Sequence, residues 1–239
     1  MVWEQACALC AAKASNTEKH QALLEGVRFP YDREAGKLSE QLRKLGLSIV
    51  TLVDEEYPQL LKEMAEPPCF LLYKGKLPAV SDSLVTVCGP FYGTAEARKE
   101  AKAFSRWLVR KGFALVSGAV SFCDRLSVRV VSESGGVAFQ VVPDLAKSIK
   151  TTTGVTLLSP FLPGMKLSHS HILSLWNVEV GLSQWTFIIQ PAGHNSAVRI
   201  ASEALDAGRD VSLLKGSLGK GGDRLYQEGC PVFSWEGEL

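Results

Sequence analysis

The stretch from Leu84 to Asp124 constrains the fold more than any other part of the chain. It begins with the apolar run Leu84–Cys88, and a glycine turn, a helix-like pattern over residues 94–111 and a second apolar run over residues 113–116 follow. This order predicts a strand, a helix and a second strand, the βαβ unit of α/β proteins. Both runs are short and lack alternation with polar residues, which is typical of parallel strands covered on both faces.

A glycine turn follows each of these two strands. Gly89 comes after the first strand, and Ser117 and Gly118 come after the second. A right-handed crossover places both turns at one edge of the sheet, where open α/β sheets bind ligands. We therefore predict that backbone N–H groups at Gly89, Ser117 and Gly118 bind a phosphate. A plain strand-to-helix turn, with Asp124 capping the next helix, is the open alternative.

Strand-like and helix-like segments alternate through most of the 239 residues, which predicts an α/β fold with a mostly parallel sheet. Residues 1–48 differ, because they show the pattern of short helices. We expect Thr17 to cap one of these helices and another to span Ser39–Leu45.

Composition excludes several classes of protein. The formal net charge of +1 gives no sign of a basic or acidic partner, and no apolar stretch is long enough to cross a membrane. The N-terminus lacks the pattern of a signal peptide, so we expect a cytoplasmic protein that does not bind membranes. Six cysteines in a chain of this length do not indicate a disulfide framework, and Cys7 and Cys10 lack a second pair for zinc, so no metal is expected.

Two groups of cations are candidates for binding nucleic acid. Arg98, Lys102 and Arg106 are spaced by four in the helix of the βαβ unit and share one stripe, which can track a phosphate backbone. A merely solvated helix face is the alternative, and Glu96 and Glu100 weaken the field.

The second group surrounds glycines after a strand near the C-terminus. Lys215, Lys220 and Arg224 follow that strand and should open at the ligand-binding edge. Cations among flexible glycines suit a run of phosphates. A surface loop without a ligand is the alternative.

Seven short motifs follow one another in the second part of the sequence. They are Tyr57–Leu61, Pro67–Gly75, Gly89 with Tyr92-Gly93, Ser117–Asp124, Gly181–Ser183, Ala204–Arg209 and Gly221–Cys230. In this order they resemble the motifs YPxxL, PPxxLxxxG, GSR…YG, SGxAxGID, the end of RNRIIAGLS, ALxxGR and GxNxLIxxGA of the DNA processing protein A (DprA, also called Smf) family.

The resemblance implies a fold and a function. The fold would be an extended Rossmann-like domain over residues 49–239, preceded by a small helical (SAM-like) domain over residues 1–48. The function would be to bind single-stranded DNA and load it onto a RecA-type recombinase in natural transformation. The protein would act without catalysis or a cofactor, as a homodimer. The resemblance adds Arg209 to the candidate DNA contacts, and we expect the chain to lack the C-terminal winged-helix domain that many members carry.

This sequence also departs from the family pattern. The GSR turn has become Gly89-Pro90-Phe91, and the two arginines of the RNR segment are replaced in Leu175–Asn177. Because these positions carry the charged part of the family's pocket, two other functions stay open. One is a Rossmann-like pocket for a nucleotide or phosphorylated ligand, and the other is a degenerate paralogue that acts as an interaction scaffold.

Overall fold

A computed structural model describes residues 1–148, 155–166, 168–190, 196–217 and 222–235. Its strands are β1 (Ser48–Thr51), β2 (Phe70–Lys74), β3 (Leu84–Cys88), β4 (Ala114–Ser117), β5 (Ala138–Val141), β6 (Thr156–Ser159), β7 (Trp185–Ile188), β8 (Asp210–Leu214) and β9 (Val232–Phe233).

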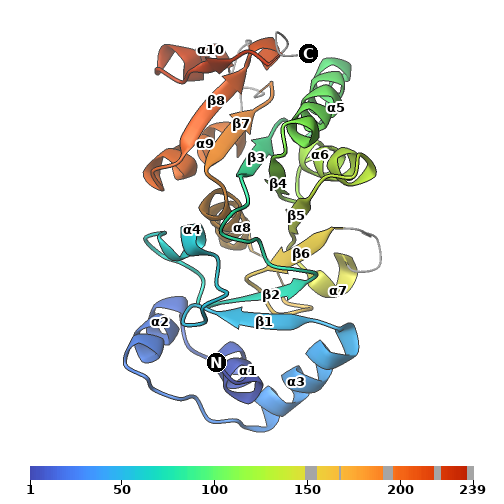
Figure 1. The fold of residues 1–239 in the computed structure, drawn as a ribbon. Helices are drawn as coiled ribbons and strands as arrows, with labels where there is room; N and C mark the ends of the chain where they lie inside the picture. The colour runs from blue at the N-terminus through green and yellow to red at the C-terminus, as the bar shows by residue number, and fades with distance from the viewer. Residues whose placement is uncertain (149–154, 167, 191–195, 218–221, 236–239) are drawn as a thin grey trace.

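Within the described residues these strands form one sheet in the order β1-β2-β6-β5-β4-β3-β7-β8-β9 (Figure 1). The pairs β1·β2 and β2·β6 are antiparallel, and the six other pairs are parallel. β3 lies near the middle, between β4 and β7. The prediction of a mostly parallel sheet in an α/β fold is confirmed.

The helices of the sheet region lie on both of its faces (Figure 1). α5 (Ala95–Arg110) and α6 (Phe122–Glu133) cover one face, where they pack on Val85 and Val87 of β3. α8 (His169–Leu182) and α9 (Ser196–Asp206) cover the other face, which Leu84 and Cys88 contact. The alternation of side chains along β3 therefore separates two apolar layers. The short helices are α4 (Gln59–Lys62), α7 (Leu145–Ser148) and α10 (Gly222–Gln227).

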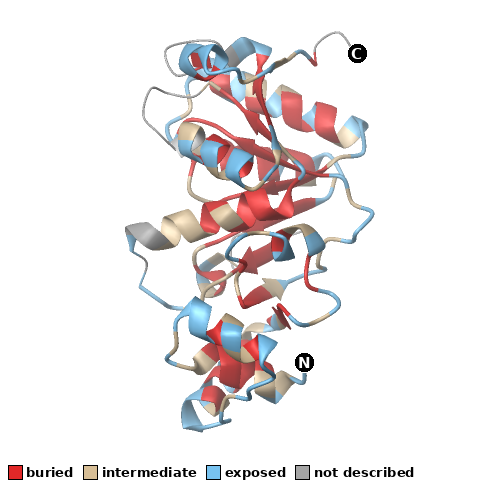
Figure 2. Cartoon of the chain, turned by 90° about the vertical axis from the view of Figure 1, so that its left-hand side faces the viewer, coloured by how far each residue is buried: buried red, intermediate tan, exposed pale blue. Residues whose placement is uncertain are grey.

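The three N-terminal helices are α1 (Trp3–Ala11), α2 (Asn16–Leu24) and α3 (Arg33–Leu45), next to β1 and β2 (Figure 1). Buried residues occur both in these helices and in the sheet (Figure 2), and Leu9 and Leu42 share one apolar cluster with Leu71 of β2. Gly46 ends α3 with a φ of 63°, a left-handed conformation that glycine adopts without strain. Division of the chain into domains at residue 48 stays a prediction.

Two predicted helix starts are wrong. α2 begins after Ser15, not Thr17, because the Ser15 hydroxyl and the Glu18 carboxylate form a reciprocal capping box. α3 begins before Ser39, because the Asp32 carboxylate accepts the backbone N–H groups of residues 34 and 35. None of the helices among the described residues is long and apolar enough to span a membrane.

Candidate functional site

A shallow groove of about 380 Å³ lies between α5 and α6. It is lined by Arg98, Lys102, Phe122, Arg125, Leu126 and Arg129. Four of these six are cations, and none of the described lining residues is acidic. On each helix the two cations are four residues apart, so they share one face and point toward the same groove. The arrangement concentrates positive charge in one place although the whole chain is nearly neutral.

Arg98 is held against an aromatic ring at one end of this groove. Its guanidinium carbon lies 4.2 Å from the centre of the Phe122 ring, and its Nε donates a hydrogen bond of 3.2 Å to the carbonyl oxygen of Gly93. Stacking on the ring restricts the side chain. Because both contacts are with uncharged groups, the positive charge of Arg98 is not neutralised by them.

Arg125 is fixed in a similar way from α6. Its Nη1 donates hydrogen bonds of 2.9 and 3.0 Å to the carbonyl oxygens of Ala119 and Val120. Arg129 instead lies 3.6 Å from the exposed carboxylate of Glu133, and a surface ion pair of this kind is weak. Phosphate oxygens could therefore replace or join these partners at little cost.

Two exposed aromatic side chains stand beside the groove, in the loop between β3 and α5. Phe91 is 49% exposed and Tyr92 is 84% exposed, and their ring centres are 4.9 Å apart in an edge-to-face arrangement. The carbonyl oxygen of Phe91 accepts the backbone N–H of Phe122 at 3.1 Å, which ties this loop to the start of α6. Exposed rings next to cations provide stacking surfaces for unpaired bases.

The two glycine turns lie next to each other, as predicted, at the carboxyl ends of the parallel strands β3 and β4. Both are covered by the protein's own atoms. A Cβ at Gly89 would meet the Cys123 side chain, and a Cβ at Gly118 would meet the Glu179 carboxyl group. Ser117 is buried, and its hydroxyl donates to the carbonyl oxygen of Val87 at 3.1 Å. Phosphate binding by these three residues stays a prediction.

A pair of buried carboxyl groups lies behind the Gly118 turn. Glu179 of α8 is 1% exposed, and Asp124 of α6 is also buried. Burial raises the pKa of Glu179 well above its usual range, the charge of Asp124 raises it further, and a hydrogen bond from the backbone of Gly118 opposes the shift. Burial also raises the pKa of Asp124, against hydrogen bonds that the Ser121 backbone N–H and hydroxyl donate to its carboxylate. Burial therefore favours the protonated form of Glu179 more strongly than that of Asp124.

Arg209 lies away from the other predicted contacts. It directly precedes β8, at the sheet edge opposite to the glycine turns. Its Nη2 donates a hydrogen bond of 2.7 Å to the carbonyl oxygen of Leu60, and its Nη1 lies 3.7 Å from the Glu63 carboxylate. These contacts join the turn before β8 to the region of α4.

The structure separates the remaining predicted cations into different places. Lys215 is exposed and begins the short 3-10 helix η1 (Lys215–Ser217), where Gly216 packs against Glu100. Glu100 is two positions from both Arg98 and Lys102, so this contact lies on the other flank of α5. Arg224 forms an ion pair of 2.8 Å with Glu228 on the exposed face of α10. Arg106 is exposed but does not line the groove. Lys220 lies outside the described residues.

Sequence reasoning identified Arg98 and Lys102 but missed Arg125 and Arg129. The same spacing by four in the helix after Ser121 was the available signal. It also missed Phe91 and the role of Phe122 as a stacking partner. No cluster of acidic, cysteine and histidine side chains able to hold a metal ion occurs among the residues that the structure describes.

Comparison with known proteins shows which family this sequence matches. A family model described as DNA recombination-mediator protein A matches residues 48–236. The DNA processing protein DprA of Bacillus subtilis is 25% identical over 211 residues, which cover 82% of this chain and 71% of that protein.

Two solved structures share this architecture. The X-ray structure of DprA from Streptococcus pneumoniae has a TM-score of 0.81 at 19% identity, covering 99% of this chain and 96% of that one. A structure of DprA from Helicobacter pylori, reported for its single-stranded DNA binding mode, has a TM-score of 0.69 at 17% identity, covering 80% of this chain and 93% of that one.

Proposed function

Because this chain belongs to the DNA recombination-mediator protein A family, we propose that it binds single-stranded DNA and loads it onto a RecA-type recombinase. The protein does so without a chemical step, in the cytoplasm, in a process of DNA uptake such as natural transformation. The single observation that carries the DNA contact is the groove between α5 and α6, with its four cations and two flanking aromatic side chains.

In this proposal, cations bind the phosphates of the DNA and aromatic rings bind its bases. The guanidinium groups of Arg98, Arg125 and Arg129 and the ammonium of Lys102 contact successive phosphates. The exposed rings of Phe91 and Tyr92 stack on bases, a contact that tolerates any sequence because every base has a π-face. Stacking of this kind needs bases that are not already paired in a duplex, so the arrangement favours single strands.

A binding site of this size suits transfer to a second protein. Contacts to phosphates are non-specific and exchange readily, and few of them are made by one copy of the groove. A homodimer would present two grooves to one strand and bind it more tightly without any new contact. The recombinase can then displace the strand from one groove at a time.

The nucleotide-binding alternative finds less support in the site. Glu179 occupies the space in front of Gly118, where a nucleotide phosphate would have to approach the backbone. We therefore place the phosphate contacts of DNA in the groove and propose no nucleotide site at the turn.

The test is fluorescence anisotropy of the full chain with a labelled oligothymidine across a salt series. We compare the natural protein with Arg125→Ala/Arg129→Ala, and with Arg110→Ala as a matched control, since Arg110 is an exposed arginine of α5 outside the groove. The proposal expects binding that weakens steeply with salt and is lost only in the groove variant. Equal binding by all three proteins would place the DNA elsewhere, and no binding at low salt would leave the scaffold alternative.

Loading is tested separately. A RecA-type recombinase is supplied with single-stranded DNA that a single-strand binding protein already covers, and filament formation is followed with and without this protein. Faster filament formation that depends on the groove cations supports loading. DNA binding without any acceleration would restrict the function to strand protection.

A further inference from the structure

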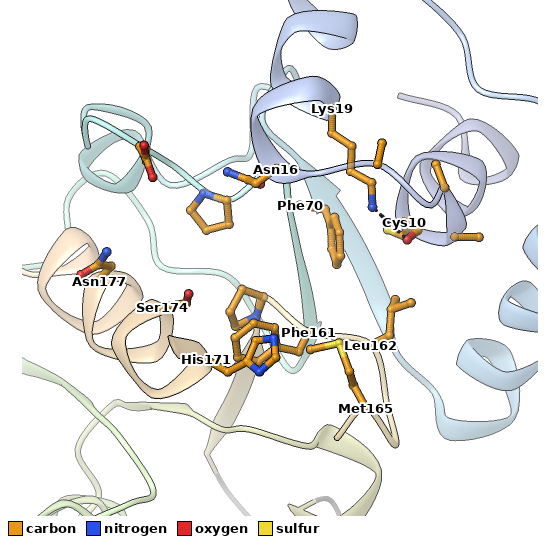
Figure 3. A pocket seen from close by; sticks show the side chains of 16 residues that line it. Cys10, Asn16, Lys19, Phe70, Phe161, Leu162, Met165, His171, Ser174 and Asn177 are labelled. Atoms are coloured by element: carbon orange, nitrogen blue, oxygen red, sulfur yellow. Dashed lines mark hydrogen bonds between the residues drawn. The ribbon is translucent and has the colours of Figure 1, made fainter. Parts of the chain in front are cut away.

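A second cavity, of about 480 Å³, lies far from the groove between the N-terminal helices and the start of α8 (Figure 3). Its walls come from α1, α2, β2, the loop after β6 and α8. Cavities of this volume between structural units are common places for small ligands. Pro68 and Phe70 of the Pro67–Gly75 motif line it, but the proposed DNA contact does not use it.

A buried cation lines this cavity. Lys19 of α2 is 8% exposed, its Nζ donates a hydrogen bond of 3.2 Å to the carbonyl oxygen of Cys10, and it lies 5.7 Å from the centre of the Phe70 ring. No carboxylate among the described residues forms an ion pair with it, and its electrostatic neighbours are the thiols of Cys10 and Cys69. Lysines buried to this extent are almost always paired with an acid.

Burial lowers the pKa of Lys19. An anion placed in the cavity would oppose that shift and satisfy the remaining donors of the ammonium group. Glu66 also lines the cavity, but it is exposed at the rim and makes no ion pair with Lys19 in the described part of the chain. An anion that paired with Lys19 would therefore lie inside the cavity.

Aromatic side chains form the middle of the cavity. Phe70 stands on one side and Phe161 across from it, with Met165 at the exposed rim (Figure 3). The Phe161 ring is held edge-to-face against the His171 ring, with the ring centres 5.0 Å apart. Aromatic walls of this kind favour a planar, apolar body in the ligand.

A buried acceptor lies at the other end. Asn177 of α8 lines the cavity on the far side from Lys19 (Figure 3), and its Oδ1 is buried without a hydrogen-bond partner among the described residues. Because this oxygen is covered by protein atoms, it does not open into the cavity. The cavity therefore offers a cation at one end and an apolar slot in the middle.

We propose that this cavity binds a small aromatic monoanion, such as an aromatic carboxylate or sulfonate. The negative group pairs with Lys19, and the ring lies between Phe70 and Phe161. A single cation with an acid at the rim suits one negative charge better than a polyphosphate. The bound molecule would bridge α2 and α8 and stabilise the folded state.

The test compares two fluorescent probes of nearly the same shape with the full-length chain. 8-Anilinonaphthalene-1-sulfonate is an aromatic anion with an N–H group, and N-phenyl-1-naphthylamine is its uncharged counterpart. We expect the anion to bind more tightly. Lys19→Met should weaken binding of the anionic probe about tenfold and leave binding of the neutral probe unchanged, because the substitution removes the charge and keeps an apolar side chain.

Matched controls identify the site. Lys62→Met, which removes an exposed lysine of α4, should bind both probes like the natural protein. Met165→Trp, at the exposed rim, should block both probes by filling the cavity, and it supplies the test if Lys19→Met fails to fold. Equal affinity of the natural protein for both probes, or unchanged binding in Met165→Trp, would overturn the proposal.

Discussion

The carboxyl group of Glu179 lies against the backbone of Gly118, in the space that a side chain at this position would occupy. The turn after β4 is therefore lined by an acid from the helix on the opposite face of the sheet. A phosphate that approached this turn would meet a buried carboxyl pair, Glu179 and Asp124, and not only backbone N–H groups. This relationship favours the groove between α5 and α6 as the place where phosphates bind.

Loss of two groove cations should reduce both the affinity for single-stranded DNA and its dependence on salt. Each phosphate contact to a single strand contributes about 0.7 to the slope of log K against log salt concentration, so Arg125→Ala/Arg129→Ala should lower the slope by about 1.4. Anisotropy titrations over a range of salt concentrations measure both quantities. The control Arg110→Ala should keep the natural slope, and a double variant with that slope would contradict the assignment.

Tyr92→Ala should weaken DNA binding without changing the salt slope. Stacking on an aromatic side chain contributes through the base and not through the phosphate, and removal of one ring typically weakens binding about tenfold. Tyr92→Phe is the matched control, because it keeps the ring and removes only the hydroxyl. If the phenylalanine variant binds as weakly as the alanine variant, the hydroxyl and not the ring makes the contact.

Glu179→Gln should change how stability depends on pH. The raised pKa of Glu179 favours its protonated form in the folded protein, whereas in the unfolded chain it ionises near its usual value. The natural protein therefore loses stability as pH rises from that usual value through the raised one, by about 1.4 kcal/mol for each unit of pKa difference. Glutamine cannot ionise, so the variant should lose less stability over the same pH range.

Urea unfolding at several pH values between about 5 and 8 measures this difference. The variant should gain stability relative to the natural protein as pH rises. Glu133→Gln, at an exposed glutamate near the end of α6, is the control and should not alter the pH dependence in this way. A constant difference between Glu179→Gln and the natural protein at all pH values would mean that Glu179 is ionised in the fold.

Arg209→Ala should destabilise the fold. The change removes the hydrogen bond to the carbonyl oxygen of Leu60 and the pairing with Glu63, and loss of a charged, largely buried hydrogen bond costs about 1–3 kcal/mol. Thermal unfolding measures the loss, and anisotropy measures DNA affinity on the folded variant. Reduced affinity at unchanged stability would instead support the DNA contact that the family motif implies.

The sequence predicted the parts of the fold that local patterns control. β3 has the bounds that its apolar run indicated, and the glycine turns after β3 and β4 are neighbours because crossovers in α/β sheets have a fixed hand. The first residues of the helices were harder to predict. Ser15, Thr17 and Asp32 are all capable caps, and only the fold shows which of them accepts a backbone hydrogen bond.

Only the part of the candidate site on α5 could be predicted from the sequence. The spacing of Arg98 and Lys102 shows that they share a face of one helix, but not which helix that face meets. The contact of Glu179 with Gly118 depends on the packing of α8 across the sheet, and the short motifs around each residue contain no sign of it. Contacts between distant segments are set by packing, which periodicity does not encode.

The position of β3 between β4 and β7 has a consequence for the order of events on the ribosome. β4 follows β3 closely in the chain, but β7 begins only at Trp185. During synthesis one edge of β3 must wait without its partner while the intervening segments emerge. An unpaired strand edge of this kind is a template for wrong association. A nascent chain halted before Trp185 should therefore need chaperone protection for β3, whereas one that has passed residue 188 and cleared the exit tunnel can pair β3 along both edges.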